Sequence, residues 1–151
     1  MEPLMANLTH PALVGFADIR TQAIDDWQQY KIEGRQYLNL AETAYRKKKK
    51  AFTAEILYNL IAMGIEKLVM SGLMEIGRLP YNHTMHDLAD SLEQWMPEAV
   101  EGMAEAIRNL DSHQEICDPY VCTIRIPTPA EIENMLALAR QLEQRLSPAS
   151  A

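Results

Sequence analysis

The stretch from Ala51 to Ile76, AFTAEILYNLIAMGIEKLVMSGLMEI, predicts a helix that is apolar around nearly its whole circumference. Such a helix lies in the middle of a bundle or between two subunits, where other helices cover most of its sides. Polar residues that include Asn59 and Glu66 make it too polar to be predicted as a membrane-spanning segment. The following Gly77 and Pro80 are the usual signal for the end of a helix.

Helical periodicity continues on the N-terminal side of this stretch. From about Ala17, apolar and small residues recur at steps of three, four or seven and share one face: Ile24, Trp27, Gly34, Leu38, Ala41 and Tyr45. The five consecutive cations of Arg46–Lys50 repel one another along a helix, so we expect the first turn there. Because no Gly or Pro occurs between Arg35 and Met63, a long bent helix or a swapped helix is the alternative.

Three helix starts are predicted in the C-terminal half. Thr84, with an acidic residue three positions later, opens one helix. Proline is favoured at the first position of a helix, and Pro97 opens the helix that we expect over 97–110. Residues 117–127 contain two prolines and predict an extended loop. The segment Thr128-Pro129-Ala130-Glu131 combines an N-cap, a proline and a capping-box acid, and predicts the start of the last helix.

Together these segments predict an all-α fold, an antiparallel up-and-down bundle of four to five helices. Residues 1–15 carry two prolines and a glycine without periodicity, which indicates an N-terminal arm. We expect residues 16–151 to form a single helical-bundle domain, since this length is enough to bury one core.

Composition narrows the class of protein. The chain of 151 residues is 48% apolar, with a formal charge of −7, which opposes non-specific binding to nucleic acids or membranes. Two cysteines, Cys117 and Cys122, are typical of a reduced protein and not of a disulfide scaffold. The first residues lack the basic and apolar regions of a signal peptide. We therefore expect a soluble, cytoplasmic protein without a membrane partner.

Several stretches are similar to one known family. Tyr37–Ala44 and Ala62–Leu68 look like the first two helices of that family, Leu79–Leu88 like the entry to its third helix, and Leu110–Pro127 like the loop before its final helix. In this order and spacing, over about residues 35–147, the chain resembles the HEPN family, small helical domains named for nucleotide binding in higher eukaryotes and prokaryotes. The resemblance implies a bundle, frequent homodimers, and roles in RNA cleavage or in partnership with nucleotidyltransferase-like proteins.

Arg108-Asn109-Leu110-Asp111-Ser112-His113 fits the ribonuclease pattern of that family, an Arg followed four to six positions later by a His. The resemblance implies that Arg108 and His113 are catalytic. A histidine near neutral pKa can accept the proton of a ribose 2′-hydroxyl or donate one to the leaving oxygen. An arginine can neutralise the charge that develops on the phosphate, and no metal is needed.

A structural role for the same residues is the alternative. Two residues five apart on a continuous helix point about 140° away from each other, so they cooperate only if the helix ends near Ser112 or a second subunit completes the cleft. In the family the motif opens the last helix, whereas here it precedes a loop. Aligning Arg125-Ile126-Pro127 with the family's Arg-Tyr-Pro loop places this chain in a branch that lacks the motif.

Asn109, Glu66 and Asn59 are the residues that we expect in a ligand cleft. Glu66, Asn59 and Glu55 form a polar strip at helical spacing on the most apolar helix. A structural hydrogen bond or ion pair is the alternative role of that strip.

We expect no metal and no cofactor. His83 and His86 with Cys117 and Cys122 offer four ligands, but neither pair has the spacing of a zinc finger. The cationic run at 46–50 either binds phosphates or is a solvated helix end.

Three functions remain open from the sequence. The first is an accessory binding module for nucleotides, RNA or a nucleotidyltransferase-like protein, homodimeric through the helix at 51–76. The second is a metal-independent endoribonuclease of the toxin type that uses Arg108 and His113. The third is a purely structural dimerisation domain.

Overall fold

The computed structural model describes residues 22–113 and 125–147 of the chain. These residues form helices joined by turns and loops, without strands, so the predicted all-α bundle is confirmed. In chain order the elements are α1 (Trp27–Arg46), α2 (Ala54–Glu75), α3 (Met85–Trp95), α4 (Pro97–Val100), α5 (Ala104–Asn109), the 3₁₀ helix η2 (Leu110–His113) and α6 (Pro129–Leu146). The predicted N-terminal arm and most of the predicted loop at 117–127 lie outside the described residues.

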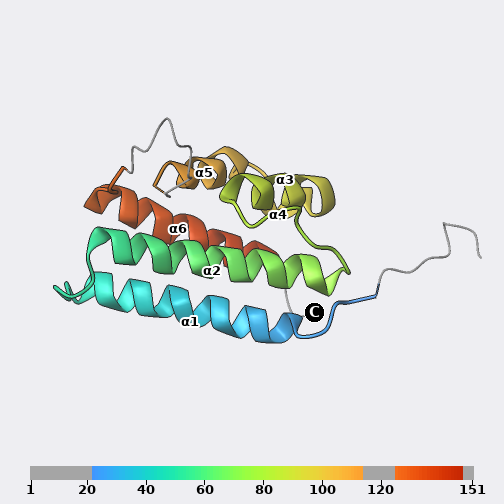
Figure 1. The fold of residues 1–151 in the computed structure, drawn as a ribbon, viewed down its shortest axis with the longest axis horizontal. Helices are drawn as coiled ribbons and strands as arrows, with labels where there is room; N and C mark the ends of the chain where they lie inside the picture. The colour runs from blue at the N-terminus through green and yellow to red at the C-terminus, as the bar shows by residue number, and fades with distance from the viewer. Residues whose placement is uncertain (1–21, 114–124, 148–151) are drawn as a thin grey trace, which may run out of the picture.

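Helices α1 and α2 form an antiparallel hairpin along the long axis of the molecule (Figure 1). Helix α1 ends at Arg46, and the lysines that follow form the turn, with Lys48 in the left-handed region at φ 49°. The prediction of a first turn at the cationic run is therefore confirmed, and the alternative of one long bent helix is excluded. Ile24, which the periodicity placed on α1, instead precedes the helix, and its N–H donates to the carbonyl of Met74 at 2.8 Å.

The two helices of the hairpin approach each other closely at a pair of glycines. A Cβ added to Gly34 would lie 3.1 Å from the carbonyl oxygen of Gly64, and one added to Gly64 would lie 3.2 Å from that of Gly34. The added Cβ of Gly64 would also lie 2.7 Å from Cδ2 of Leu38, a fully buried side chain. Both positions therefore require glycine for packing, because neither leaves room for a side chain at the crossing.

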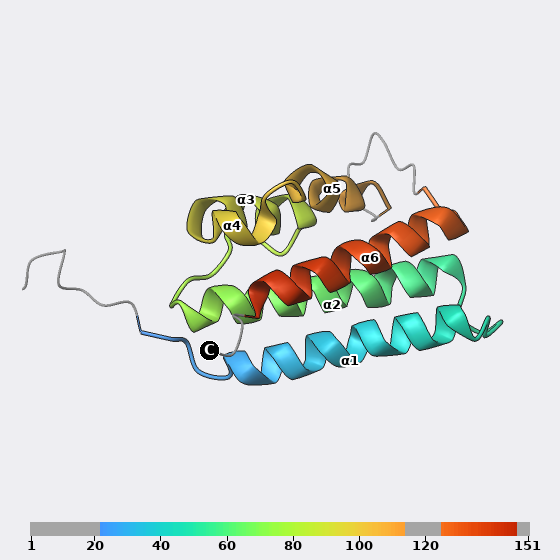
Figure 2. The ribbon, with the colours of Figure 1, turned by 180° about the vertical axis from the view of Figure 1, so that it is seen from behind.

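Helix α6 lies beside α2 and runs parallel to it. Near the start of α6, Glu133 pairs with Arg46 at the end of α1, and near its end Leu146 packs on Gly72 of α2. Among the three long helices, α1 is thus antiparallel to both α2 and α6, whereas α2 and α6 are parallel, so the predicted up-and-down order holds for α1 and α2 but does not extend to α6. Figure 2 shows the reason: the loop over 77–84 returns along the bundle, α3 then runs in the direction of α2, and α4 and α5 lead the chain back to the end where α6 begins.

The short helices form a second layer over α2 and α6 (Figure 1). The prediction of a single helix over 97–110 is wrong, because α4 ends at Val100 and α5 begins only at Ala104. Gly102 between them has φ 74°, a left-handed conformation that ends a helix and that glycine adopts at little cost. The predicted apolar face still points inward across the break, and its members are all buried: Val100, Met103, Ile107 and Leu110.

Two predicted helix starts are confirmed by their capping hydrogen bonds. The hydroxyl of Thr128 accepts the N–H of Glu131, and the Glu131 carboxylate accepts the N–H of Thr128, which completes a capping box on α6. The hydroxyl of Thr84 accepts the N–H of Asp87 at the start of α3. These contacts satisfy backbone donors that a helix end otherwise leaves without partners.

Helix α2 is the centre of the core, with 13 of its 22 residues buried within this single chain. By length and composition α2 could also cross a membrane, but 67% of its apolar window is buried inside the bundle, as in the core helix of a globular domain. Two large apolar side chains of α2, Ile56 and Met63, remain exposed.

The close crossing of α1 and α2 predicts the effect of a small substitution. Gly64→Ala gains about 1 kcal/mol of helix propensity but overpacks the crossing at a cost of up to about 3 kcal/mol, so we expect a net loss of up to about 2 kcal/mol in the free energy of unfolding. Asn59→Ala, on the exposed face of the same helix, is the matched control and should leave stability unchanged or slightly raised. Urea denaturation measures both, and a Gly64→Ala variant as stable as the control contradicts the packing argument.

Candidate functional site

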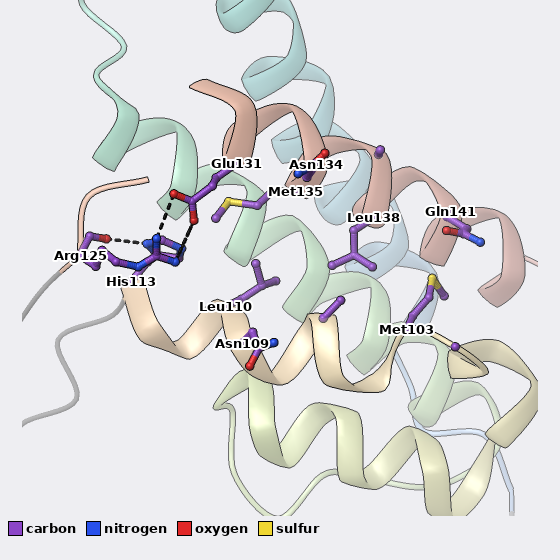
Figure 3. A pocket seen from close by; sticks show the side chains of 13 residues that line it. Met103, Asn109, Leu110, His113, Arg125, Glu131, Asn134, Met135, Leu138 and Gln141 are labelled. Atoms are coloured by element: carbon purple, nitrogen blue, oxygen red, sulfur yellow. Dashed lines mark hydrogen bonds and ion pairs between the residues drawn. The ribbon is translucent and has the colours of Figure 1, made fainter. Parts of the chain in front are cut away.

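A pocket of about 460 Å³ opens between α6 and the segment formed by α5 and η2 (Figure 3). Its apolar lining includes Met103 and Leu110 from one side and Met135 and Leu138 from α6. Polar residues complete the lining: Asn109, His113, Arg125, Glu131, Asn134 and Gln141. The pocket therefore combines an apolar surface with several polar groups, which is the usual composition of a small-molecule site.

One end of the pocket carries a three-residue cluster, formed by His113, Arg125 and Glu131 (Figure 3). Arg125 and Glu131 form a two-point ion pair, with Nη1 3.0 Å from Oε1 and Nη2 2.8 Å from Oε2. Nε2 of His113 lies 3.3 Å from Nη2 of Arg125 and 3.4 Å from Oε2 of Glu131. A titratable ring nitrogen thus faces both a cation and a carboxylate.

The backbone fixes which nitrogen of His113 carries the proton when the ring is neutral. Nδ1 lies 2.5 Å from the carbonyl oxygen of Arg125, and because a carbonyl only accepts, Nδ1 must be the donor. The lone pair of the neutral ring is therefore on Nε2, the atom nearest to Arg125 and Glu131. The ring itself is almost fully buried and packs against Tyr58, at 5.4 Å between ring centroids.

Glu131 stays ionised in this cluster. The N–H of Thr128 has the largest effect and, together with the guanidinium of Arg125, lowers the pKa of the Glu131 carboxyl below its ordinary value, although burial acts in the opposite direction. The same carboxylate therefore caps α6 and holds Arg125 at the mouth of the pocket.

The structure gives Arg108 and His113 separate partners. Arg108 lies between α3 and α5, where its guanidinium is 2.6 Å from a carboxylate oxygen of Asp90, of Glu93 and of Glu105. These carboxylates, Glu93 above all, raise the pKa of Arg108 above its ordinary value. Arg108 is not among the residues that line the pocket, and no described hydrogen bond or ion pair joins it to His113.

The residues between Arg108 and His113 also make structural contacts. The carboxylate of Asp111 accepts the N–H groups of Met85 and His86, both at 2.9 Å, so it caps the first turn of α3. The carbonyl of Leu110 accepts the hydroxyl of Tyr58 at 2.8 Å. This segment therefore joins η2 to α3 within the short-helix layer and to α2 below it.

The three expected ligand-cleft residues lie in different places. Asn109 lines the pocket, and within the described ranges its side-chain amide makes no hydrogen bond. Glu66 does not line it, and instead its Oε1 lies 2.6 Å from Nδ1 of His83, which joins α2 to the loop before α3. Asn59 is exposed on α2 and is also not part of the pocket.

The sequence did not single out Arg125 or Glu131 as site residues. Arg125 entered only through the resemblance of a loop, and Glu131 only as a helix cap. The capping box was a usable signal, because it fixes Glu131 on the first turn of α6, the turn that His113 meets. The contact itself links residues far apart in sequence, so local periodicity cannot show it.

Comparison with protein-family models, with curated proteins and with solved structures finds no match to this chain.

The lowered pKa of Glu131 predicts a pH dependence of stability. A carboxyl whose pKa is lowered by folding stabilises the protein above its unfolded pKa of about 4.5, and this contribution is lost as the pH falls through the folded value. Glu131→Gln keeps a capping acceptor but lacks the charge. We expect the wild type to be more stable than Glu131→Gln at pH 6, and the difference to be smaller at pH 3, because it shrinks as the pH falls below about 4.5. Urea denaturation at the two pH values measures this, and a constant difference contradicts it.

Proposed function

We propose that this chain is an accessory binding module whose site is the α5–α6 pocket, and that the site takes a nucleotide or the end of an RNA strand. The observation that carries the proposal is the polarised lining of the pocket, with Arg125 and His113 at one end and an apolar floor beside them. The resemblance to HEPN domains, whose partners include nucleotidyltransferase-like proteins, points in the same direction.

The dimensions and lining of the pocket support a ligand of this size. Small-molecule sites occupy roughly 300–1,000 Å³, and about 460 Å³ falls within that range. Met103, Leu110 and Leu138 offer apolar surface to the flat faces of a base. The amides of Asn134 and Gln141 make no hydrogen bond within the described part of the chain, which leaves them available to the edge of a base.

Arg125 supplies the contact to phosphate. Its side chain is 59% exposed, and its pairing with Glu131 leaves further N–H donors at the mouth of the pocket. Protonation of His113 on Nε2 would add a second charge-assisted donor beside the guanidinium. A phosphate placed there meets one or two cations and one carboxylate, so the site favours a single phosphate over a long polyanion.

A nucleotide titration tests the proposal. We expect AMP to bind the wild-type chain and to raise its melting temperature, because a ligand stabilises the state that it binds. Arg125→Gln should weaken AMP about tenfold and leave the weaker binding of adenosine unchanged, since only the phosphate contact is lost. Calorimetric titration measures both affinities.

Arg78→Gln is the control for that experiment. It removes an equal charge, but Arg78 stacks on Trp95 in another part of the molecule. If the two variants weaken AMP equally, or if AMP does not bind the wild type, the pocket is not a nucleotide site.

Metal-independent RNA cleavage is the second candidate function, and the contact between His113 and Arg125 favours it. In that reaction Nε2 of His113 takes the proton of a 2′-hydroxyl, the 2′-oxygen attacks phosphorus to form a 2′,3′-cyclic phosphate, and the P–O5′ bond breaks as the 5′-oxygen takes a proton from water. The arginine beside the histidine in this structure is Arg125, at 3.3 Å, and not the Arg108 of the sequence motif.

Cleavage of a single-stranded RNA in the presence of a chelator separates the enzyme from the binding module. For the enzyme we expect His113→Asn, which keeps a donor towards the carbonyl of Arg125 but has no basic nitrogen, to lose at least a hundredfold in rate. Arg125→Gln should lower the rate strongly and Arg108→Gln only weakly. Equal rates for wild type and His113→Asn exclude catalysis by His113. If Arg108→Gln lowers the rate more than Arg125→Gln does, the catalytic arginine is Arg108, as the sequence motif implies.

A homodimer remains part of the proposal. The exposed Ile56 and Met63 lie seven residues apart on one face of α2, the face where a second copy would pack.

A further inference from the structure

A second pocket lies at the turn between α1 and α2. Figures 1 and 2 show that this turn is at the end of the bundle where α6 begins. Its volume is about 530 Å³. Apolar and aromatic side chains form its inner part, and cations stand at its edge; the lining is Ala44, Tyr45, Arg46, Lys48, Lys49, Phe52, Leu57, Pro129 and Glu133. None of these residues belongs to the α5–α6 pocket.

The charge of this pocket is opposite to that of the protein. Among the described residues that line the pocket, Glu133 is the only one with a carboxylate, and both of its oxygens pair with Arg46, at 2.8 and 2.9 Å. Arg46 lowers the pKa of Glu133, so this pair stays ionised and neutral as a whole. Lys48 and Lys49 form no ion pair within residues 22–113 and 125–147, which leaves the lining with a formal charge of +2 in a chain of −7.

The shape of the pocket is fixed by contacts that do not involve these two lysine side chains. The hydroxyl of Tyr45 donates to the carbonyl of Pro129 at 3.3 Å, which holds its ring against the start of α6. The backbone N–H groups of Lys48 and Lys49 donate to Tyr45 and Ala44, each at 3.1 Å. The backbone of both lysines is thus held in the turn by hydrogen bonds, while their side chains remain exposed to solvent.

We propose that the pocket at the α1–α2 turn binds a small amphipathic anion, a flat apolar group that carries one phosphate or carboxylate. The apolar group packs against Tyr45 and Phe52, and the anion pairs with Lys48 and Lys49. Lysine is a common binder of phosphate as a point charge, and aromatic rings offer flat partners for stacking. This inference is independent of the nucleotide proposal for the α5–α6 pocket, because the two sites share no residue.

The lysine run offers a matched comparison between a pocket and a diffuse cationic surface. Lys48 and Lys49 line the pocket, whereas their neighbours Lys47 and Lys50 do not. A polyanion such as a nucleic-acid backbone or an acidic peptide would use all four lysines about equally, since they lie in one turn. A small ligand seated in the pocket depends on the inner pair only.

Titration of the full chain with 1-naphthyl phosphate, inorganic phosphate and 1-naphthol tests this inference. We expect naphthyl phosphate to bind at least about tenfold more tightly than either fragment, because it uses both halves of the pocket. Lys48→Gln/Lys49→Gln should weaken it about tenfold, and Lys47→Gln/Lys50→Gln, with the same change in net charge, less than about twofold.

Each other outcome overturns the inference. If the two double variants weaken the binding of naphthyl phosphate equally, the lysines act as a diffuse cationic surface that suits a polyanion. If inorganic phosphate binds as tightly as naphthyl phosphate, the apolar part of the pocket does not contribute to binding. Arg125→Gln should not affect naphthyl phosphate, so a loss in that variant assigns the binding to the α5–α6 pocket instead. Thermal denaturation confirms that the variants, which alter exposed side chains, remain folded.

Discussion

The enclosure of α2 is the constraint from which the rest of the structure follows. A helix that is apolar on nearly every side must be covered by several neighbours, and neighbours within this chain bury 13 of the 22 residues of α2. Helix α1 covers one side through the glycine crossing at Gly34 and Gly64, and α6 covers another where Leu146 meets Gly72. The short helices cover a third side, and the α5–α6 pocket arises where this second layer meets α6.

Sequence was sufficient wherever the determining interaction is local. The capping box of Thr128 and Glu131 spans four residues, and it marked the start of α6 correctly. The like charges of Arg46–Lys50 marked the first turn for a similar reason, because repulsion along a helix acts between neighbours. The apolar period of α2 identified the centre of the core without any knowledge of what covers it.

Sequence was insufficient where the partner is distant or the backbone is special. The break at Gly102 depends on a positive φ that periodicity does not reveal, since the apolar positions on both sides keep their spacing. The family resemblance paired His113 with an arginine five residues away, but the arginine that it contacts is twelve residues away in the sequence. Glu66 looked like part of a cleft, yet its partner is His83 in a loop that helical spacing cannot place. The sequence therefore predicted Asn109 and His113 as site residues, but not the cation Arg125 or the carboxylate Glu131.

The way α3 is capped bears on the order in which the molecule assembles. Its first two amides are held by Asp111, which follows them in the chain by 26 and 25 positions, so the cap cannot form before that part of the chain arrives. Contacts of α6 span still more, with Arg140 to Glu42 closing 98 residues and Arg35 to Glu143 closing 108. The hairpin of α1 and α2, by contrast, contains all of its own crossing contacts. Because distant contacts carry the larger entropy of loop closure, we expect the hairpin to form first, and both pockets need α6 in place because residues of α6 line them.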